Sequence, residues 1–350
     1  MKDISRMRTT VVKEGGSGTM GNPYSESSEW HDDIGKIYAL LEHVISFEKN
    51  SSDVLKLRRL NRIMSVHAST AIEGNRLTLG EVTDVINGIP VWGPPKDIKE
   101  VQNAWQAYNR LDGYDPWNMT DILSAHATMT DSLIGESGIF RSVDVGVFRS
   151  DGVMLHQGAP PGDVPELMRA LLEWGRKSEA HPLIKSSAVH YMIEHIHPFR
   201  DGNGRIGRLW QTLILSKWNP LFAWMPVEIL VHNNQRQYYR ALQDSHGNGT
   251  DCRPFIDFML AVIEDSLHRY VGMSETDVGV NVGVKGEVLE AIRNNPSASA
   301  QDIAKMINKS ARTVERYIRE LRDDGLIKRT GSDKKGVWII SETIPFPGRM

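Results

Sequence analysis

Residues His197–Arg208 read HPFRDGNGRIGR and lie between two apolar stretches, AVHYMIEHI before them and LWQTLILSKW after them. This pattern predicts two helices joined by a tight loop. Gly202 and Gly204 allow the loop backbone to turn sharply and to direct its N–H groups inward. The helix that begins near Arg205 adds the positive end of its dipole. We therefore expect an anion-binding loop at this point of the chain.

The charged side chains of the stretch fit a phosphate chain. Arg205 and Arg208 are three residues apart, so both guanidinium groups can reach oxygens of one polyphosphate. Asp201 is a hard oxygen ligand suited to Mg²⁺ that bridges phosphates. His197 has an unperturbed pKa of about 6.5, which suits a general base near neutral pH. The stretch thus predicts a phosphate site with a base beside it.

A hydrolytic metal site is an alternative interpretation of the same region, because imidazole and carboxylate groups bind zinc and iron. Its ligands would be His190, His195, His197 and Asp201. We rank it lower because His190 and His195 are five residues apart, too far round a helix for one face, and because the two arginines would repel a second cation.

The stretch resembles the motif H-x-F-x-[D/E]-G-N-G-R-x-x-R of the Fic family at all eight fixed positions. The resemblance covers roughly residues 52–270 and implies a mainly α-helical core with a short β-hairpin flap. It also implies an enzyme that transfers AMP from ATP to a Ser, Thr or Tyr hydroxyl of a protein, which can be the chain itself, and releases pyrophosphate. Removal of AMP by the same site, transfer of another phosphate-linked group, and a nucleotide-sensing DNA-binding regulator without turnover stay open as alternatives.

The resemblance assigns roles by position. His197 would deprotonate the target hydroxyl, Asp201 would hold Mg²⁺, and Phe199 would anchor the loop in the core. The α-phosphate would be held by Asn203 with the amides of Gly202 and Gly204, and the β- and γ-phosphates by Arg205 and Arg208. Gly207 completes the nucleotide-binding set within the motif.

A second motif, STAIEGNRLT at residues 69–78, resembles the Fic inhibitory motif [S/T]-x-x-x-E-[G/N], with Ser69, Glu73 and Gly74 at its fixed positions. Gly74 supplies the left-handed residue that commonly ends a helix. A carboxylate at a helix C-terminus opposes the helix dipole at a cost of about 0.3–1 kcal/mol unless a cation lies nearby. The resemblance implies that Glu73 pairs with Arg208 and blocks productive seating of the γ-phosphate. In some relatives the same glutamate positions water for removal of AMP.

Two further segments are expected at the nucleotide. The stretch VFRSDGVMLHQ predicts a β-hairpin that turns at Asp151-Gly152, and the resemblance identifies it as a flap whose edge pairs with an extended target segment. Its residues nearest the nucleotide would be Leu155, His156, Gln157 and Gly158. The stretch NNQRQYYRAL resembles the helix that lines the adenine pocket, where Tyr238 and Tyr239 offer stacking faces. Other helical aromatic residues are assigned to the core, namely Trp105, Tyr108, Trp174 and Trp210.

Composition sets the general class of the 350-residue chain. Its formal net charge is −3 and it has one cysteine, Cys252, so neither an internal disulfide nor a zinc site built from cysteines alone is expected. This fits a cytoplasmic protein. No apolar run approaches the roughly 18–20 residues of a membrane span, and no secretory signal or membrane partner is expected.

Patterning divides the chain into five segments: a mobile tail over 1–28, helices with the inhibitory motif over 29–98, the Fic core over 99–271, a linker over 272–284 and a winged helix-turn-helix over 285–345. In the last, Leu289, Ile292, Ile303, Met306, Ile307, Val314, Ile318 and Leu321 should form the core. Basic side chains gather on its third helix and its wing: Arg312, Arg316, Arg319, Arg322, Lys328, Arg329, Lys334 and Lys335. We expect this module to bind DNA or, alternatively, to act as a docking or homodimerising domain.

Overall fold

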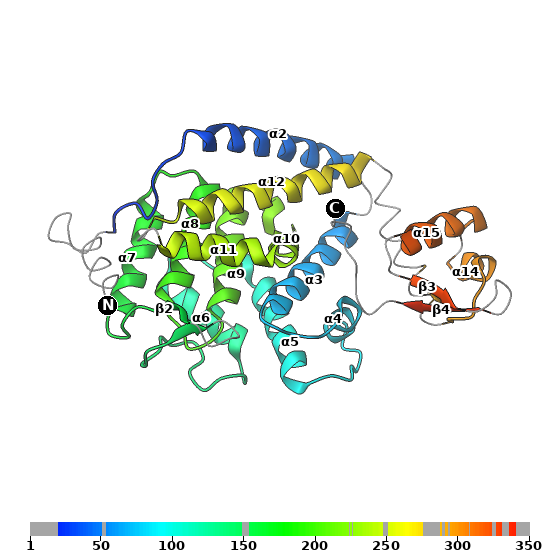
Figure 1. Ribbon diagram of the computed structural model, residues 1–350, viewed down its shortest axis with the longest axis horizontal. Helices are drawn as coiled ribbons and strands as arrows, with labels where there is room; N and C mark the ends of the chain where they lie inside the picture. Colours follow the sequence, from blue (N-terminus) through cyan, green and yellow to red (C-terminus); the bar gives the residue numbers. More distant parts are fainter. Residues whose placement is uncertain are drawn as a thin grey trace. The chain divides into compact units, whose positions relative to one another are not determined.

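The computed structural model describes residues 20–50, 54–148, 154–223, 225, 227–247, 251–275, 288, 291–292, 295–307, 309–323, 327–330 and 336–340. The chain divides into two compact units, one of residues 1–48 and 54–269 and one of residues 49–53 and 270–350. The predicted tail and linker lie mostly outside the described residues, and the finer segment boundaries stay predictions. The predicted fold class is confirmed, since helices dominate both units (Figure 1).

The first unit is helical apart from one hairpin. Its helices are α2 (Glu29–Asn50), α3 (Val54–Ile72), α4 (Leu79–Ile86), α5 (Pro95–Asn109), α6 (Met119–Thr130), α7 (Val164–Lys177), α8 (Pro182–Ile196), α9 (Asn203–Trp218), α10 (Val227–Asn233), α11 (Gln235–Gly247) and α12 (Arg253–Glu275), with 3-10 turns η1 (Leu111–Gly113) and η2 (Pro220–Ala223). Helix α4 begins in a capping box, in which Thr78 and Glu81 each satisfy a backbone N–H of the other.

Helices α8 and α9 form the centre of this unit, and the first thirteen residues of α9, from 203 to 215, are all buried. The close approach of the two helices depends on Gly207, because a Cβ at that position would lie 2.5 Å from His190 Cδ2. Trp210 and Tyr108 are among the largest fully buried side chains, as predicted, and Trp174 is also buried. Trp105 is only partly buried, and the guanidinium of Arg59 lies 5.7 Å from the centre of its ring.

The predicted hairpin is present. Strands β1 (Gly146–Phe148) and β2 (Met154–Gln157) are antiparallel, and Val147 pairs with His156. The predicted turn at Asp151-Gly152 and the side chain of Leu155 lie outside the described residues.

In the second unit the structure describes helices α14 (Ala300–Met306) and α15 (Ala311–Asp323) and the antiparallel strands β3 (Ile327–Thr330) and β4 (Val337–Ile340). The predicted core is largely confirmed, with Ile292, Ile303, Val314, Ile318 and Leu321 buried. The prediction that Met306 lies in the core is wrong, since this residue ends α14 and is 56% exposed. The core also contains three residues that the pattern did not indicate: Tyr317, Ile327 and Trp338. Leu289 lies outside the described residues.

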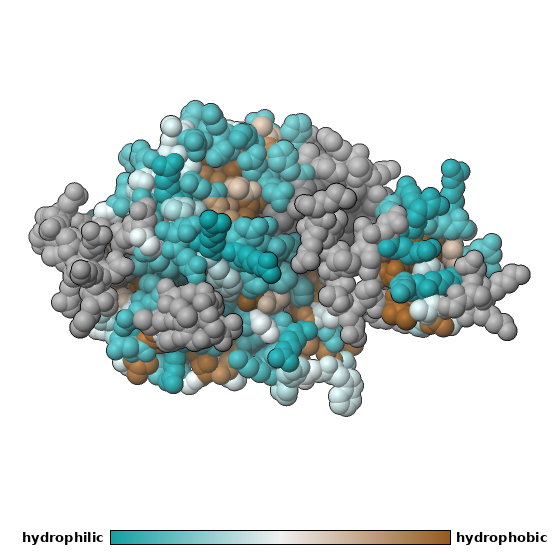
Figure 2. All heavy atoms as spheres, viewed as in Figure 1, coloured by the Kyte–Doolittle hydropathy of each residue, from teal (hydrophilic) through white to brown (hydrophobic). Residues whose placement is uncertain are grey.

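The surface of the described residues is mainly hydrophilic on the face shown in Figure 2, with hydrophobic side chains in separate patches. Among the described helices, none combines the length and the apolar composition that crossing a membrane requires. Cys252 is buried as a free thiol.

Candidate functional site

The loop between α8 and α9 has a tightly determined backbone. His197 caps α8 in the left-handed region, with φ of 53°, and Gly202 begins α9 with φ of 88°. A non-glycine residue in this region is uncommon and must be held by its surroundings. Arg141 holds it here, because its Nε donates to the His197 carbonyl at 2.7 Å and its backbone N–H donates to the Pro198 carbonyl at 3.0 Å. Arg141 is thus a positioning residue that no sequence pattern indicated.

The side chain of Asn203 closes the loop from the other end. It accepts from the Phe199 N–H and donates to the Phe199 carbonyl, both at 2.8 Å. The Phe199 ring is fully buried and stacks on His126 with a centroid distance of 3.7 Å, so its predicted anchoring position is what the structure shows. His126 also had no signal in the sequence. Its Nε2 donates to the Asp201 carbonyl at 2.9 Å, and its Nδ1 accepts from the Gly138 N–H.

His197 is held in one protonation form. Its Nδ1 lies 3.3 Å from the Glu194 carbonyl oxygen, which can only accept, so Nδ1 carries the ring hydrogen and Nε2 keeps a lone pair. Burial lowers the pKa of His197 to about 4, although the hydrogen bond to Glu194 opposes this. The imidazole is therefore neutral at pH 7 and presents Nε2 as a proton acceptor.

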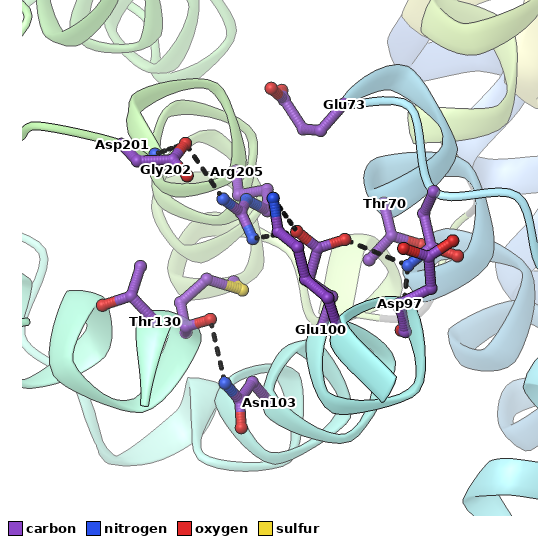
Figure 3. A network of polar contacts seen from close by, with 12 residues as sticks. Thr70, Glu73, Asp97, Glu100, Asn103, Thr130, Asp201, Gly202 and Arg205 are labelled. Atoms are coloured by element: carbon purple, nitrogen blue, oxygen red, sulfur yellow. Dashed lines mark hydrogen bonds and ion pairs between the residues drawn. The ribbon is translucent and has the colours of Figure 1, made fainter. Parts of the chain in front are cut away.

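Arg205 lies between two carboxylates, as Figure 3 shows. Its Nη2 is 3.2 Å from Asp201 Oδ1, and its Nη1 is 3.5 Å from Oε1 of Glu100 on α5. The guanidinium is almost fully buried, whereas the Asp201 side chain is 46% exposed. Asp201 Oδ1 also accepts from the Gly202 N–H at 2.6 Å. The sequence did not indicate Glu100, because it is far from Arg205 along the chain and no local pattern connects the two residues.

Arg208 is bound to the end of α3. Its Nε donates to Ser69 Oγ at 3.1 Å, and its Nη2 donates to the Ser69 carbonyl at 3.0 Å and to Glu73 Oε1 at 2.6 Å. Gly74, with φ of 91°, turns the chain directly after Glu73. Burial alone would lower the pKa of Arg208, but Glu73, Tyr238 and Glu194 together outweigh burial and the pKa is raised. The ion pair expected from the second motif is therefore present.

Gly204 lies under this ion pair. A Cβ at position 204 would collide with Glu73 Oε1 and would lie 3.1 Å from both Arg208 Nη1 and Glu194 Oε1. The absent side chain thus lets the Glu73 carboxylate reach the first turn of α9. Two carboxylates, Glu73 and Glu194, meet there beside one guanidinium.

Glu194 is partly buried, and four influences act on its pKa. Its pKa is raised to about 7, mainly by burial and then by the charge of Glu73, while Arg208 opposes both. Its Oε1 lies 3.1 Å from the Tyr238 hydroxyl, which is also 3.2 Å from His190 Nε2. His190 donates from Nδ1 to Gln211 Oε1 at 2.7 Å, so its neutral Nε2 can only accept. The Tyr238 hydroxyl donates its hydrogen to Glu194 Oε1, and this bond favours the carboxylate form and opposes the rise in the pKa of Glu194.

This network predicts a pH-dependent stability. The folded-state pKa of about 7 lies above the ordinary value of 4.5, so the stabilisation is fully present below about pH 4.5 and is lost as the pH rises through 7. We expect the wild type to lose on the order of 3 kcal/mol of unfolding free energy between about pH 5 and pH 8, and Glu194→Gln to lose much less. Urea unfolding at each pH measures this. The exposed Glu179→Gln serves as control, and equal pH slopes in Glu194→Gln and wild type would contradict the assignment.

The residues expected at the nucleotide differ in burial and in their contacts. Tyr238 is 1% exposed, so burial removes the stacking face that was predicted for it, whereas Tyr239 is 42% exposed. Gly207 packs against His190, and its predicted nucleotide contact stays a prediction. His156 points to the helices, with Nε2 donating to the His195 carbonyl at 2.6 Å.

The end of the flap lies next to the predicted base. Gln157 is exposed, and the Gly158 N–H donates to the Val145 carbonyl at 3.1 Å. A Cβ at position 158 would lie 3.1 Å from His197 Cβ, so this glycine allows the strand end to approach the base.

The alternative metal site is not assembled. His190 is bound to Gln211 and Tyr238, while Nδ1 of His195 faces Nδ1 of His246 at 3.0 Å. His197 is held by the Glu194 carbonyl. The four predicted ligands therefore do not converge on one point.

Two parts of the chain match known families. Residues 116–215 match the Fic/DOC family, and residues 284–328 match a winged helix-turn-helix DNA-binding family. Protein adenylyltransferase fic-1 of Caenorhabditis elegans is 27% identical over 243 residues, covering 65% of this chain and 45% of the relative. Protein adenylyltransferase Fic of Nematostella vectensis is 30% identical over 220 residues, covering 59% and 48%. The chain thus spans about half the length of the curated relatives it matches.

A solved structure extends the similarity to both units. The crystal structure of a Fic family protein from Desulfovibrio desulfuricans superposes with a TM-score of 0.69 at 34% identity, covering 92% of this chain and 98% of that one. A second structure, a fragment of Fic-1 from C. elegans, superposes with a TM-score of 0.55 at 26% identity over 69% of this chain and 72% of that one. Since the likeness to the bacterial structure runs along nearly the whole of both chains, and the loop motif is intact, this chain belongs to the Fic family.

Proposed function

We propose that the chain is a protein adenylyltransferase, which transfers AMP from ATP to a Ser, Thr or Tyr hydroxyl of a protein, either a separate target or the chain itself. The observation that carries this proposal is the fixed tautomer of His197, whose Nε2 keeps its lone pair in a loop at the N-terminus of α9. A site that only sensed nucleotide would not require such a base. The names of the relatives, protein adenylyltransferases at 27–30% identity, support the same activity.

The proposed step is a displacement at the α-phosphorus of ATP. The target hydroxyl oxygen forms a bond to this phosphorus as its proton passes to Nε2 of His197. The bond between the α-phosphorus and the bridging oxygen of the leaving pyrophosphate breaks. The first backbone N–H groups of α9 have no intrahelical acceptors, so they and the helix dipole stabilise the added negative charge.

The phosphate contacts are assigned to backbone and arginine groups. The side chain of Asn203 is used by the Phe199 backbone, so its contribution to the α-phosphate is its backbone N–H. Arg205 and Arg208 remain the ligands proposed for the β- and γ-phosphates, and the exposed face of Tyr239 is the stacking surface proposed for adenine.

Mg²⁺ fits the site, because the Asp201 carboxylate is half-exposed beside the phosphate loop and offers a hard oxygen ligand. When bound, the ion would neutralise charge on the phosphates. The residue proposed to hold it is Asp201.

We propose further that Glu73 inhibits the enzyme. Its carboxylate binds Arg208 Nη2 at 2.6 Å, and Arg208 is buried, so a phosphate oxygen reaches this guanidinium only by displacing Glu73. Glu73 also lies over Gly204, in the first turn of α9. It therefore competes with the polyphosphate for both the arginine and the space.

The test of the activity is the position of the transferred label. Purified chain, with and without cell lysate as a source of target, is incubated with Mg²⁺ and ATP labelled on either the α- or the γ-phosphate. AMP transfer predicts protein-bound label from the α-position only. Label from the γ-position would indicate a kinase, and absence of label from both, also in the activated variant discussed below, would contradict the proposal. Sensing without turnover is not favoured, because it has no need of the intact base.

We propose duplex DNA as the partner of the second unit. On α15 the side chains of Arg312, Arg319 and Arg322 are exposed, and Lys328 of β3 is exposed as well. Arg316 is engaged within the helix, since it pairs with Glu320 at 3.8 Å and stacks on Tyr317. The match to a DNA-binding winged-helix family supports this partner. The predicted wing residues Lys334 and Lys335 lie outside the described residues.

Binding of the full chain to a fluorescent DNA duplex tests this partner. We expect the affinity to fall steeply with salt, and the slope against log salt to decrease by about one in each of Arg312→Ala and Arg319→Ala, because each removes one cation from a phosphate. Arg169→Ala, an exposed arginine of α7, is the control and should leave the slope unchanged. Equal slopes and affinities in all variants would favour the docking or dimerising alternative.

A further inference from the structure

Three histidines from separate elements meet beside the loop. His156 lies on β2, His195 in the last turn of α8 and His246 in the last turn of α11. One ring nitrogen from each lies within 4.8 Å of the others. The closest pair is His195 Nδ1 and His246 Nδ1, 3.0 Å apart. The Tyr191 hydroxyl lies 3.0 Å from His246 Nδ1 and 3.5 Å from His195 Nδ1.

Two ring nitrogens in this cluster face each other, and a third is buried without a hydrogen-bond partner among the described residues. Two neutral Nδ1 atoms that face each other share at most one hydrogen, because two N–H groups would point their hydrogens at one another. The Tyr191 hydroxyl adds one hydrogen and further lone pairs. The Nε2 of His195 is buried and, within the described residues, has no hydrogen-bond partner. The described contacts therefore leave the tautomer of the His195 ring undetermined.

The imidazoles of His195 and His246 do not carry an additional proton at neutral pH. Burial lowers the pKa of His195 to about 3 and that of His246 to about 2, and the neighbouring His156 contributes to both shifts. Both imidazoles are then neutral at pH 7, which is the form that binds metal ions. These two imidazoles and that of His156 bring one ring nitrogen each within 4.8 Å of the others.

We propose that His156, His195 and His246 form a binding site for a transition-metal ion of the imidazole-preferring class, such as Zn²⁺. Ligand nitrogens around a tetrahedral zinc ion are about 3.3 Å apart, given Zn–N bonds of about 2.0–2.1 Å. The separation of 3.0 Å between the Nδ1 atoms of His195 and His246 is close to that edge length. A water molecule or the oxygen of Tyr191 would take the fourth position.

His156 must turn to join the other two. Its ring is stacked parallel to that of His246, with a centroid distance of 4.0 Å and an interplanar angle of 4°. Two parallel rings cannot direct their in-plane lone pairs at one ion. Because His156 is only partly buried and lies on the two-stranded hairpin, its ring is the one that can rotate.

Metal binding would therefore join the flap to the helical core. Strand β2 is followed by Gly158, where a Cβ would lie 3.1 Å from His197 Cβ. On rotation of its ring, His156 would exchange its bond to the His195 carbonyl for a bond to the ion. An ion held by β2, α8 and α11 would fix the strand end beside the base. The site itself does not depend on the proposed transfer of AMP.

The experiment is a metal titration of the full chain, freed of any histidine tag. Cobalt(II) is added first, because tetrahedral cobalt absorbs in the visible range, and Zn²⁺ is then used to displace it. Equilibrium dialysis with elemental analysis gives the stoichiometry. We expect one metal ion to bind tightly per chain. The affinity for the ion should fall about tenfold to a hundredfold in His246→Ala and in His195→Ala.

Controls separate this site from other histidines and from misfolding. His43→Ala removes an exposed histidine of α2 and should bind as the wild type does. His246→Gln keeps a polar side chain of similar size, and circular dichroism verifies that each variant is folded. Absence of tight binding in the wild type, or wild-type affinity in folded His246→Gln, would overturn the proposal.

Discussion

Replacing Glu73 with glycine is expected to raise the rate of AMP transfer about tenfold to a hundredfold. The hydrogen bond of 2.6 Å between Arg208 Nη2 and Glu73 Oε1 joins two charged groups, and bonds of this kind contribute about 1.5–3 kcal/mol. In the wild type the γ-phosphate must replace this bond before it is seated. In Glu73→Gly the Arg208 guanidinium is available to the γ-phosphate. Removing a cost of about 1.5–3 kcal/mol corresponds to a rate increase of about tenfold to a hundredfold.

The fold should tolerate the change, because Arg208 keeps two partners. Its bonds to Ser69 Oγ and to the Ser69 carbonyl do not involve Glu73. Initial rates of label transfer from α-labelled ATP measure the effect. Glu179→Gly, at an exposed position between α7 and α8, is the matched control and should leave the rate unchanged.

A second variant separates charge from space. Glu73→Gln keeps the size of the side chain over Gly204 but weakens its hold on Arg208, so an intermediate rate is expected. An unchanged or lower rate in Glu73→Gly, with the fold intact, would contradict the inhibitory role and would favour a glutamate that positions water for removal of AMP.

Much of the site could be predicted from the sequence because it is local. The helix–loop–helix over α8 and α9 depends on two apolar stretches and on Gly202, which adopts the left-handed backbone that the pattern required. The second motif, at residues 69–78, was also recognisable in the sequence, and the resemblance predicted that its Glu73 pairs with Arg208.

What could not be predicted is the set of contacts that hold the loop from a distance in the chain. Arg141 and His126 bind the loop backbone, and Glu100 binds Arg205 from α5. Each is a single polar residue in no local pattern, so only the tertiary structure reveals its partner. Tyr238 illustrates the reverse error, since a tyrosine pair on a helix does not show which ring is buried in a polar network.

Replacing His197 with alanine is expected to lower AMP transfer by a factor of about 10² to 10⁴, the usual contribution of a general base. The loss should fall on the chemical step, because the loop is held by Arg141, Asn203 and Phe199 and not by the imidazole. The measurement is best made in the Glu73→Gly background, where the higher rate leaves room to detect a large decrease. ATP binding, followed separately by calorimetry, should change little.

The pH profile gives an independent check on the same group. A base must be neutral to accept a proton, and the pKa of His197 is lowered to about 4, mainly by burial. The neutral fraction therefore stays close to one from neutral pH down to about pH 5, and the rate is lost as the pH falls through about 4. An unperturbed histidine would instead lose half its activity at about pH 6.5. Retention of the full rate in folded His197→Ala would remove the base from the mechanism.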